Sequence, residues 1–403
     1  MSGQQHRKTR PLATLASPLS LPSFPGEEIH PANGHILGCG NLHAVTNLTV
    51  IGAGWTKIVY RGHYKNMQLA IKTVHTAGHD MFNCHTDVSV CYQHAAAKIM
   101  KESELLQQLA HSNVIKVLGE CIPNIDYFPG PPAVGMVSIV TELGQQLDVV
   151  QILQMNFEDR LRLAYDVGKI LQHLALSPLG SLLMKDFRRQ QFVLVDGIIK
   201  LSDVDDLVIG DPRCSFDNDC LMKDENTDNV IVNLTCEEGR CSGFNSRLNA
   251  VYAGRHFMRY MMPYGCPEGL ETEALDMVNR QLKGILNSEG VFLRIHQLVK
   301  DYSSGSYLTP FDKEYINNYA AHHGFTIQDA DFSCFQTVSI GCVQSVSSAA
   351  EGALLCSRMH ECRAFVLLDD FTWTGRQIAV FKSAATGIKE NTHHKVYIRR
   401  GQG

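Results

Sequence analysis

Two aspartates, Asp186 and Asp203, flank a stretch whose pattern predicts a β-hairpin. Between them lie two short apolar runs, FVLV and IIKL, joined by Asp196-Gly197, a dipeptide typical of a tight two-residue turn. A hairpin folds the chain back on itself, so we expect both carboxylates to face one cleft. Adjacent carboxylates repel each other unless a cation or a proton lies between them. The pattern therefore indicates a metal site or an acid–base pair, and the alternative is two surface aspartates beside an ordinary hairpin.

A second pattern lies upstream, in residues 48–75, which predict strands. In chain order it contains Gly52, Ala53, Gly54, Val59, Ala70 and Lys72. Glycines let a backbone pass close to a phosphate and leave its amides free to donate. A lone GxG is weak evidence for a nucleotide site, but a following valine and an A-x-K run give the layout of a protein-kinase glycine loop and its strand lysine. Lys57 stands where that loop has its third glycine.

The elements that would position these residues follow in order. Residues 93–110 predict a helix in which Glu102 fits the E-x-x-x-L-x-x-L-x-H-x-N pattern of the third kinase helix. Glu102 is then the expected partner of Lys72; Glu104 is a competing candidate, and a solvated helix glutamate is the alternative. Residues 136–144 predict a buried strand that suits a hinge between lobes. Its backbone groups at Glu142 and Leu143 would bond an adenine edge, with Thr141 behind them.

The composition limits the classes of function. The chain has 403 residues, of which 44% are hydrophobic, enough for two or three domains with a large core. The net charge is −5 and spread along the chain, which does not suggest a nucleic-acid or acidic-membrane partner. The sequence also lacks an apolar run long enough for a transmembrane helix.

The thirteen cysteines gather in clusters near residues 84–91, 214–241 and 334–362. The sequons at Asn47 and Asn233 are glycan candidates, and Asn233 lies inside the middle cluster. Together these features favour an oxidising, secretory compartment. Zinc is the rival interpretation, but the sequence lacks the tight CxxC pairs that it would need. The odd number leaves at least one cysteine unpaired or bridged to another chain.

The remaining segments indicate where the folded part begins and where its domains end. Residues 1–35 predict disorder, and because the first residues have no apolar h-region, we expect the chain as given to lack its true start. Residues 157–176 and 246–262 predict helices, residues 268–302 predict two more, and residues 208–245 are rich in loops and cysteines. In the helix over 246–262, Asn249 and Gly254 keep the spacing that kinases fill with Asp and Gly. After about residue 325 a helix followed by C-x5-C-x-A-F indicates a disulfide-stapled appendage that partly resembles apple/PAN modules.

With these motifs placed, the chain resembles a protein kinase from near 48 to near 310. It looks most like the secretory-pathway kinases of the vertebrate lonesome kinase group, on TELG, SPLGS, DFR-x-x-QFVLVDG and AFV…TWTGRQ. The resemblance implies an α+β, two-lobed protein-kinase-like fold with a C-terminal disulfide-rich appendage. Its expected parts are an N-terminal extension (1–47), a kinase N-lobe (48–144), a C-lobe (145–325) and a cysteine-containing C-terminal module (326–403).

The resemblance also implies roles. Asp186 would be the catalytic base, Asp203 and Gln191 would hold Mg²⁺ or Mn²⁺, and Lys72, fixed by Glu102, would hold the ATP phosphates. The glycine turn, Glu142 and Leu143 would bind ATP. Val59, Ala70 and Val193 would enclose the adenine. These parts suit phosphoryl transfer, which needs positioned phosphates, a divalent metal and a carboxylate on the incoming hydroxyl.

The sequence departs from the kinase pattern at several points. Met184 and Lys185 replace His-Arg, Gln191 replaces Asn, and Val204 and Asp205 replace the Phe-Gly that follows the metal-binding aspartate. No A-P-E run follows, and the cysteine-rich segment stands in its place. We therefore expect cystines, not loop phosphorylation, to hold that segment in one shape.

The expected function is an extracellular or Golgi-lumenal protein kinase that transfers phosphate from ATP to tyrosines of secreted or lumenal proteins. The tyrosine preference rests on the resemblance, and Arg188, two residues after the expected base, is compatible with it. The alternatives are a pseudokinase or scaffold and a glycan kinase of the secretory pathway. Retention of Lys72, Glu102, Asp186 and Asp203 together argues against a degraded site.

Overall fold

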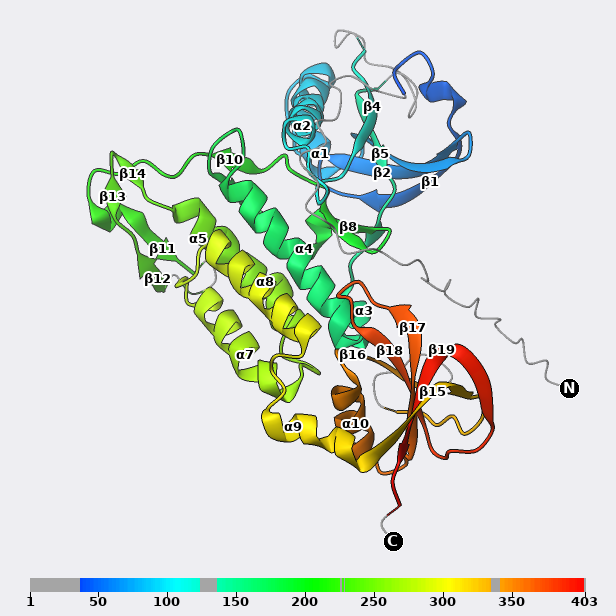
Figure 1. The fold of residues 1–403 in the computed structure, drawn as a ribbon. Coiled ribbons are helices and arrows are strands. Elements are labelled where there is room, and N and C mark those ends of the chain that lie inside the picture. Colours follow the sequence, from blue (N-terminus) through cyan, green and yellow to red (C-terminus); the bar gives the residue numbers. More distant parts are fainter. Residues whose placement is uncertain (1–36, 124–135, 225–226, 228, 335–340, 402–403) are drawn as a thin grey trace, which may run out of the picture. The chain divides into compact units, whose positions relative to one another are not determined.

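The computed structural model describes residues 37–123, 136–224, 227, 229–334 and 341–401 (Figure 1). The disorder predicted for residues 1–35 lies outside this described part. Contacts divide the chain into two units, and the boundary falls between Lys300 and Asp301. We call the described residues 37–300 the N-terminal unit and 301–401 the C-terminal unit.

The N-terminal unit begins with a five-stranded antiparallel sheet of order β1-β2-β3-β5-β4. A long helix, α2, packs against it through a cluster that includes Val74, Ala96, Ile99 and Ile139. Helix α2 begins earlier than the predicted helix because Asp87 caps it by accepting from the Ser89 amide. The elements are η1 (Leu42–Ala44), β1 (Thr46–Ala53), β2 (Lys57–Tyr64), β3 (Met67–Val74), α1 (His79–Phe82), α2 (Val88–Gln108), β4 (Val117–Cys121) and β5 (Ser138–Glu142).

The rest of this unit is mainly helical, around α4. Asn156 caps α4 by accepting from the Asp159 amide, and its apolar face, including Leu161, Ala164 and Leu171, is fully buried. The elements are β6 (Gln145–Gln146), α3 (Val149–Gln154), α4 (Phe157–Ala175), β7 (Leu182–Met184), η2 (Arg189–Gln191), β8 (Phe192–Val195), β9 (Ile198–Leu201), β10 (Leu207–Ile209), η3 (Asp217–Cys220), β11 (Leu221–Lys223), β12 (Val230–Asn233), β13 (Cys236–Glu237), β14 (Arg240–Cys241), α5 (Phe244–Ala253), a π-helix (Gly254–Met258), α6 (Arg259–Met261), α7 (Glu268–Leu282) and α8 (Ser288–Ser304).

The predicted hairpin forms. Strands β8 and β9 pair antiparallel with Val195 opposite Ile198, which leaves a two-residue loop. Asp196 and Gly197 have φ values of 49° and 79°, the left-handed conformation that this loop requires and that Asp-Gly adopts readily.

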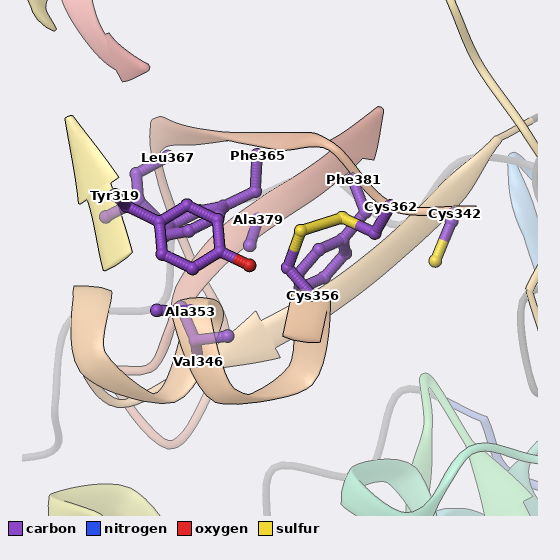
Figure 2. Close-up of a cluster of buried hydrophobic side chains, with 10 residues drawn as sticks. All are labelled: Tyr319, Cys342, Val346, Ala353, Cys356, Cys362, Phe365, Leu367, Ala379 and Phe381. Atoms are coloured by element: carbon purple, nitrogen blue, oxygen red, sulfur yellow. A yellow bond between two sulfur atoms is a disulfide. The ribbon is translucent and has the colours of Figure 1, made fainter. Parts of the chain in front are cut away.

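The C-terminal unit holds a second antiparallel sheet, of order β15-β19-β17-β18-β16, with α10 packed against it. Figure 2 shows the Cys356–Cys362 bridge among the aromatic rings of this core, beside Phe381. Strand β15 spans residue 325, so the C-terminal sheet begins before the predicted module boundary at 326. The elements are α9 (Pro310–Glu314), η5 (Tyr315–Asn318), β15 (Tyr319–Ile327), β16 (Cys342–Val346), α10 (Ala349–Arg358), β17 (Ala364–Phe371), β18 (Gln377–Lys382) and β19 (Ile388–Arg399).

Twelve of the thirteen cysteines form disulfides, and Cys266 is free. This pairing is consistent with the predicted oxidising compartment, and it accounts for the odd cysteine. Within the described residues, no helix is long and apolar enough to cross a membrane. The bridges are Cys39–Cys121, Cys84–Cys91, Cys214–Cys236, Cys220–Cys241, Cys334–Cys342 and Cys356–Cys362.

Candidate active site

Lys72 lies on β3 and points into a buried ion cluster. Its Nζ donates to Oε1 of Glu102 at 2.6 Å and to the Ser202 carbonyl at 2.5 Å. Glu102, on α2, is fully buried. Glu104, the competing candidate, is exposed and accepts from Gln108 instead. The fold therefore joins the early lysine to the segment that follows the hairpin.

Asp203 follows β9 and lies in the same cluster. The amides of Ser202 and Asp203 both donate to the Gln191 carbonyl, at 2.8 and 3.2 Å, which fixes the chain where it leaves the hairpin. Burial raises the pKa of Asp203, but Lys57 and Lys72 more than offset it and lower this pKa to about 2. Asp203 is therefore an anion at neutral pH.

Two residues that the sequence analysis did not place here complete the cluster. Lys57, the first residue of β2, contacts Oε2 of Glu102, Oδ1 of Asp203 at 2.7 Å and Oδ2 of Asp205 at 3.0 Å. Burial lowers the pKa of Lys57, but the three carboxylates outweigh it and raise this pKa above its ordinary value. Burial and the nearby Asp203 raise the pKa of Asp205 to about 6, although Lys57 opposes them. The only sequence signals were departures from the kinase pattern, a lysine and an aspartate at two glycine positions.

The cluster has the donor chemistry of a divalent-cation site. Oxygen atoms of Glu102, Asp203 and Asp205 all lie within 4.8 Å of one another. Mg²⁺ and related hard cations prefer carboxylate oxygens. These residues therefore fit a hard divalent cation such as Mg²⁺, with Asp205 as an added candidate ligand.

Asp186 lies in the turn just after β7 and before the hairpin. Arg188 donates to both of its carboxylate oxygens, and the Gln191 side-chain amide donates to Oδ2. The hydrogen bond from Arg188 is the main cause that lowers the pKa of Asp186, despite partial burial. The structure thus places the Gln191 side chain on Asp186, and its expected role as a metal ligand stays a prediction.

Asn249 of α5 holds the backbone that leads to Asp186. This fully buried side chain accepts from the Met184 amide at 3.0 Å and donates to the Leu182 carbonyl at 2.7 Å. One amide can make both bonds because it carries a donor and an acceptor. The strand end, and with it Asp186, is thereby fixed to the helical core.

The turn predicted at Gly52–Gly54 lies slightly later in the structure, because Gly52 and Ala53 still pair with β2 and the chain turns between Gly54 and Lys57. This glycine turn is tied to the segment after β3. The Thr56 hydroxyl donates to Asp80 at 2.6 Å, and the Trp55 ring stacks on His79 with centroids 4.4 Å apart. A Cβ at Gly78 would lie 2.4 Å from the Trp55 carbonyl, so only glycine permits this approach. The Cys84–Cys91 bridge then closes this inserted segment.

The residues expected around adenine lie on neighbouring strands. Ala70 pairs with Thr141 across β3 and β5, and Val59 pairs with Gly52 across β2 and β1. The Glu142 amide donates to the Lys116 carbonyl at 3.1 Å, so of its two backbone groups only the carbonyl would serve an adenine edge. Val193 lies on β8 after the hinge, and Leu143 lies between β5 and β6.

Both disulfides of the middle cluster lie within the segment after Asp203. Cys214–Cys236 and Cys220–Cys241 join its two sides. Asn47 and Asn233, the sequon asparagines, are both exposed. Glycosylation of either residue stays a prediction.

The chain is 33% identical over 375 residues to the human extracellular tyrosine-protein kinase PKDCC, across 92% of this chain and 74% of that protein. No protein-family model matches the chain.

Proposed function

Because the chain belongs to the family of the extracellular tyrosine-protein kinase PKDCC, we propose that it transfers the γ-phosphate of ATP to tyrosines of secreted or lumenal proteins. The observation that carries this proposal is the buried Lys72–Glu102 pair, whose lysine also contacts the residue before Asp203. A member of a kinase family that had lost catalysis would have no need to keep this costly buried arrangement.

In this proposal Lys72 binds the α- and β-phosphates. Glu102 holds its ammonium in place, and the glycines at Gly52 and Gly54 let the backbone pass close to the phosphates. Val59, Ala70 and Val193 enclose the adenine, and the carbonyl of Glu142 with the backbone of Leu143 recognises its edge.

Asp203 and Asp205 would hold a divalent ion, Mg²⁺ or Mn²⁺. This ion supplies positive charge that offsets the charge on the phosphoryl group as it moves. The donor set of three clustered carboxylates supports this assignment.

Asp186 orients the acceptor tyrosine. The bond between the γ-phosphorus and the oxygen of ADP breaks, a new bond forms to the tyrosine oxygen, and the hydroxyl proton passes to Asp186. Its lowered pKa makes Asp186 a weak base in the ground state. This suits a loose transition state in which the proton leaves late and positioning matters most.

The compartment follows from the same reasoning. The relative is named as extracellular, and six disulfides require an oxidising environment. We propose that the protein works in the Golgi lumen and outside the cell, with glycans on Asn47 and Asn233.

The test is a transfer assay on the protein as secreted by cells. Wild type, Asp186→Ala and Lys72→Met are incubated with labelled ATP, Mg²⁺ or Mn²⁺ and secreted proteins, and the labelled residue is identified. Phosphotyrosine with wild type, and its loss in both variants, is the expected result. No transfer by wild type would indicate a pseudokinase, and label released by glycosidase would indicate a glycan kinase.

A further inference from the structure

Lys57 is a cation that the proposed mechanism does not use. Its side chain is 10% exposed and reaches three carboxylates. Glu102 already has a partner in Lys72, which takes the other carboxylate oxygen. A second lysine is therefore not needed to hold Glu102, and the contacts of Lys57 with Asp203 and Asp205 call for a separate explanation.

The charges in the cluster do not balance. Among the side chains in contact, Glu102, Asp203 and Asp205 carry up to three negative charges, whereas Lys57 and Lys72 supply two positive ones. A third lysine, the exposed Lys101, donates to the Asp205 carbonyl at 2.6 Å and forms no ion pair with these carboxylates. Lys57 holds the two carboxylates that are the candidate metal ligands. A direct metal contact at Asp203 would put a second cation within a few ångströms of the ammonium, and the two would repel each other. Lys57 and a divalent ion thus compete for the same carboxylates.

Lys57 also stands where it could reach a nucleotide. It is the first residue of β2, and its carbonyl accepts from the Gly54 amide at 2.8 Å, so the glycine turn and the lysine form one continuous piece of backbone. A lysine side chain is a flexible stem with a point charge, which can change partners without moving the backbone.

We propose that Lys57 is a second lysine of the nucleotide site, one that occupies the metal carboxylates when the site is free and exchanges them for ATP phosphates when metal and nucleotide bind. This inference rests on the proposed function. It makes Lys57 a stand-in for the metal in the free enzyme and a phosphate ligand in the loaded one.

The exchange predicts two opposite effects of one substitution. In Lys57→Met, Mn²⁺ alone should bind more tightly, because its competitor is gone. MgATP should bind more weakly, because a charged donor to phosphate is lost. We expect each dissociation constant to change by about tenfold or more, the size of one charge-assisted hydrogen bond.

The experiment measures binding, not only activity. Mn²⁺ binding without nucleotide is followed by the paramagnetic resonance of the free ion, and MgATP binding by calorimetry, on the full secreted chain. Lys283→Met is the matched control, since Lys283 is an exposed lysine just after α7; neither constant should change. Lys57→Arg keeps the charge and should bind Mn²⁺ as wild type does. Lys57→Gln replaces Lys57→Met if the latter is not secreted.

The possible outcomes separate the two proposals. If Lys57→Met tightens Mn²⁺ and weakens MgATP, the exchange is supported. If both constants weaken, or neither changes, or only MgATP weakens, Lys57 has only a structural or static role and the exchange is refuted, while the proposed kinase function stands. A wild type that binds no MgATP would overturn both.

Discussion

Arg376 and Lys57 are both buried cations, one in each unit, but their surroundings differ in kind. Arg376 is 2% exposed and forms an ion pair with Glu351 at 2.7 Å. Its other donors reach the carbonyls of Tyr302 and Ser345, and its guanidinium lies 4.0 Å from the centroid of the Tyr302 ring. One positive and one negative charge are thus fully matched by fixed partners.

The cluster around Lys57 is not matched in this way. Three carboxylates face two lysines, and Asp205 is held with a pKa raised to about 6. A neutralised ion pair such as Arg376–Glu351 needs no further partner and serves the fold. A cluster with excess negative charge, in contrast, attracts a cationic ligand and is typical of a functional site. Charge balance, more than burial, therefore distinguishes a structural ion pair from a ligand-binding site.

The largest expected effect is on catalysis. Asp203→Asn should lower phosphoryl transfer by about 10³-fold or more, because the metal loses a charged ligand. Thermal unfolding should also shift to a lower temperature, because the lowered pKa of Asp203 shows that its charge stabilises the fold, so transfer is compared at a temperature where both proteins are folded. Asp206→Asn, at an exposed neighbour, is the control and should keep full activity. If Asp203→Asn kept its activity, the ion cluster around Lys57 would not be the catalytic metal site.

The next effect concerns the Arg376–Glu351 pair. Arg376→Met should lower the free energy of unfolding of the C-terminal unit by about 3–5 kcal/mol, because Glu351 is left charged and unpaired. In a Trp55→Phe background Trp373 is the only tryptophan, so its fluorescence reports this unit during denaturation. Arg363→Met, at an exposed arginine, should have almost no effect. A loss of less than 1 kcal/mol in Arg376→Met would contradict the comparison.

A smaller effect on stability, of opposite sign, is expected in the ion cluster around Lys57. Asp205→Asn should raise the free energy of unfolding by about 1 kcal/mol at neutral pH, because it removes a carboxylate whose raised pKa shows that its charge is disfavoured. Chemical denaturation without metal measures this gain. Activity should fall at the same time, as expected where a site sacrifices stability for function. If the substitution destabilised the protein, the negative charge of Asp205 would be fully compensated by Lys57, and the cluster would carry no excess charge.

A last effect, of similar size, concerns a partly buried pair of histidines. The rings of His111 and His173 stack with centroids 4.5 Å apart, and burial, then His173 and Lys169, lower the pKa of His111 to about 4. Between pH 4 and 6.5 the unfolded chain therefore binds more protons at this residue than the folded one, so stability falls as the pH falls. From pH 7 to pH 5 this loss should be on the order of 1 kcal/mol. Denaturation curves of His111→Gln should depend less on pH over this range than those of wild type.

Much of the frame was predictable from the sequence. The hairpin and helix α4 follow from local patterns, because Asp-Gly turns and helical periodicity act over a few residues. The pairing of Lys72 with Glu102, 30 residues apart, was expected only because both residues fit the kinase pattern. Asn249 was also noted, although its bonds to the backbone of Leu182 and Met184 became visible only in the structure.

Lys57, Asp205 and the Gln191 side chain show where sequence reasoning stopped. The first two residues lie at positions that kinases fill with glycine, and their charges have meaning only once β2, α2 and the chain after β9 come together. The Gln191 side chain donates to Asp186, five residues earlier, and the spacing of the two residues does not predict this contact. The disulfide partners were likewise unreadable, since cysteine spacing permits many connectivities.

The distribution of the disulfides has a practical consequence. One bridge, Cys39–Cys121, closes a loop with a sequence separation of 82, and others staple the glycine-turn insertion, the segment after Asp203 and the C-terminal core. Buffers for intracellular kinases routinely include dithiothreitol, and bacterial cytosol is itself reducing. Protein that is produced or assayed under these conditions would lose some of its disulfides, and a lack of activity in such a sample would not show that the native protein is inactive.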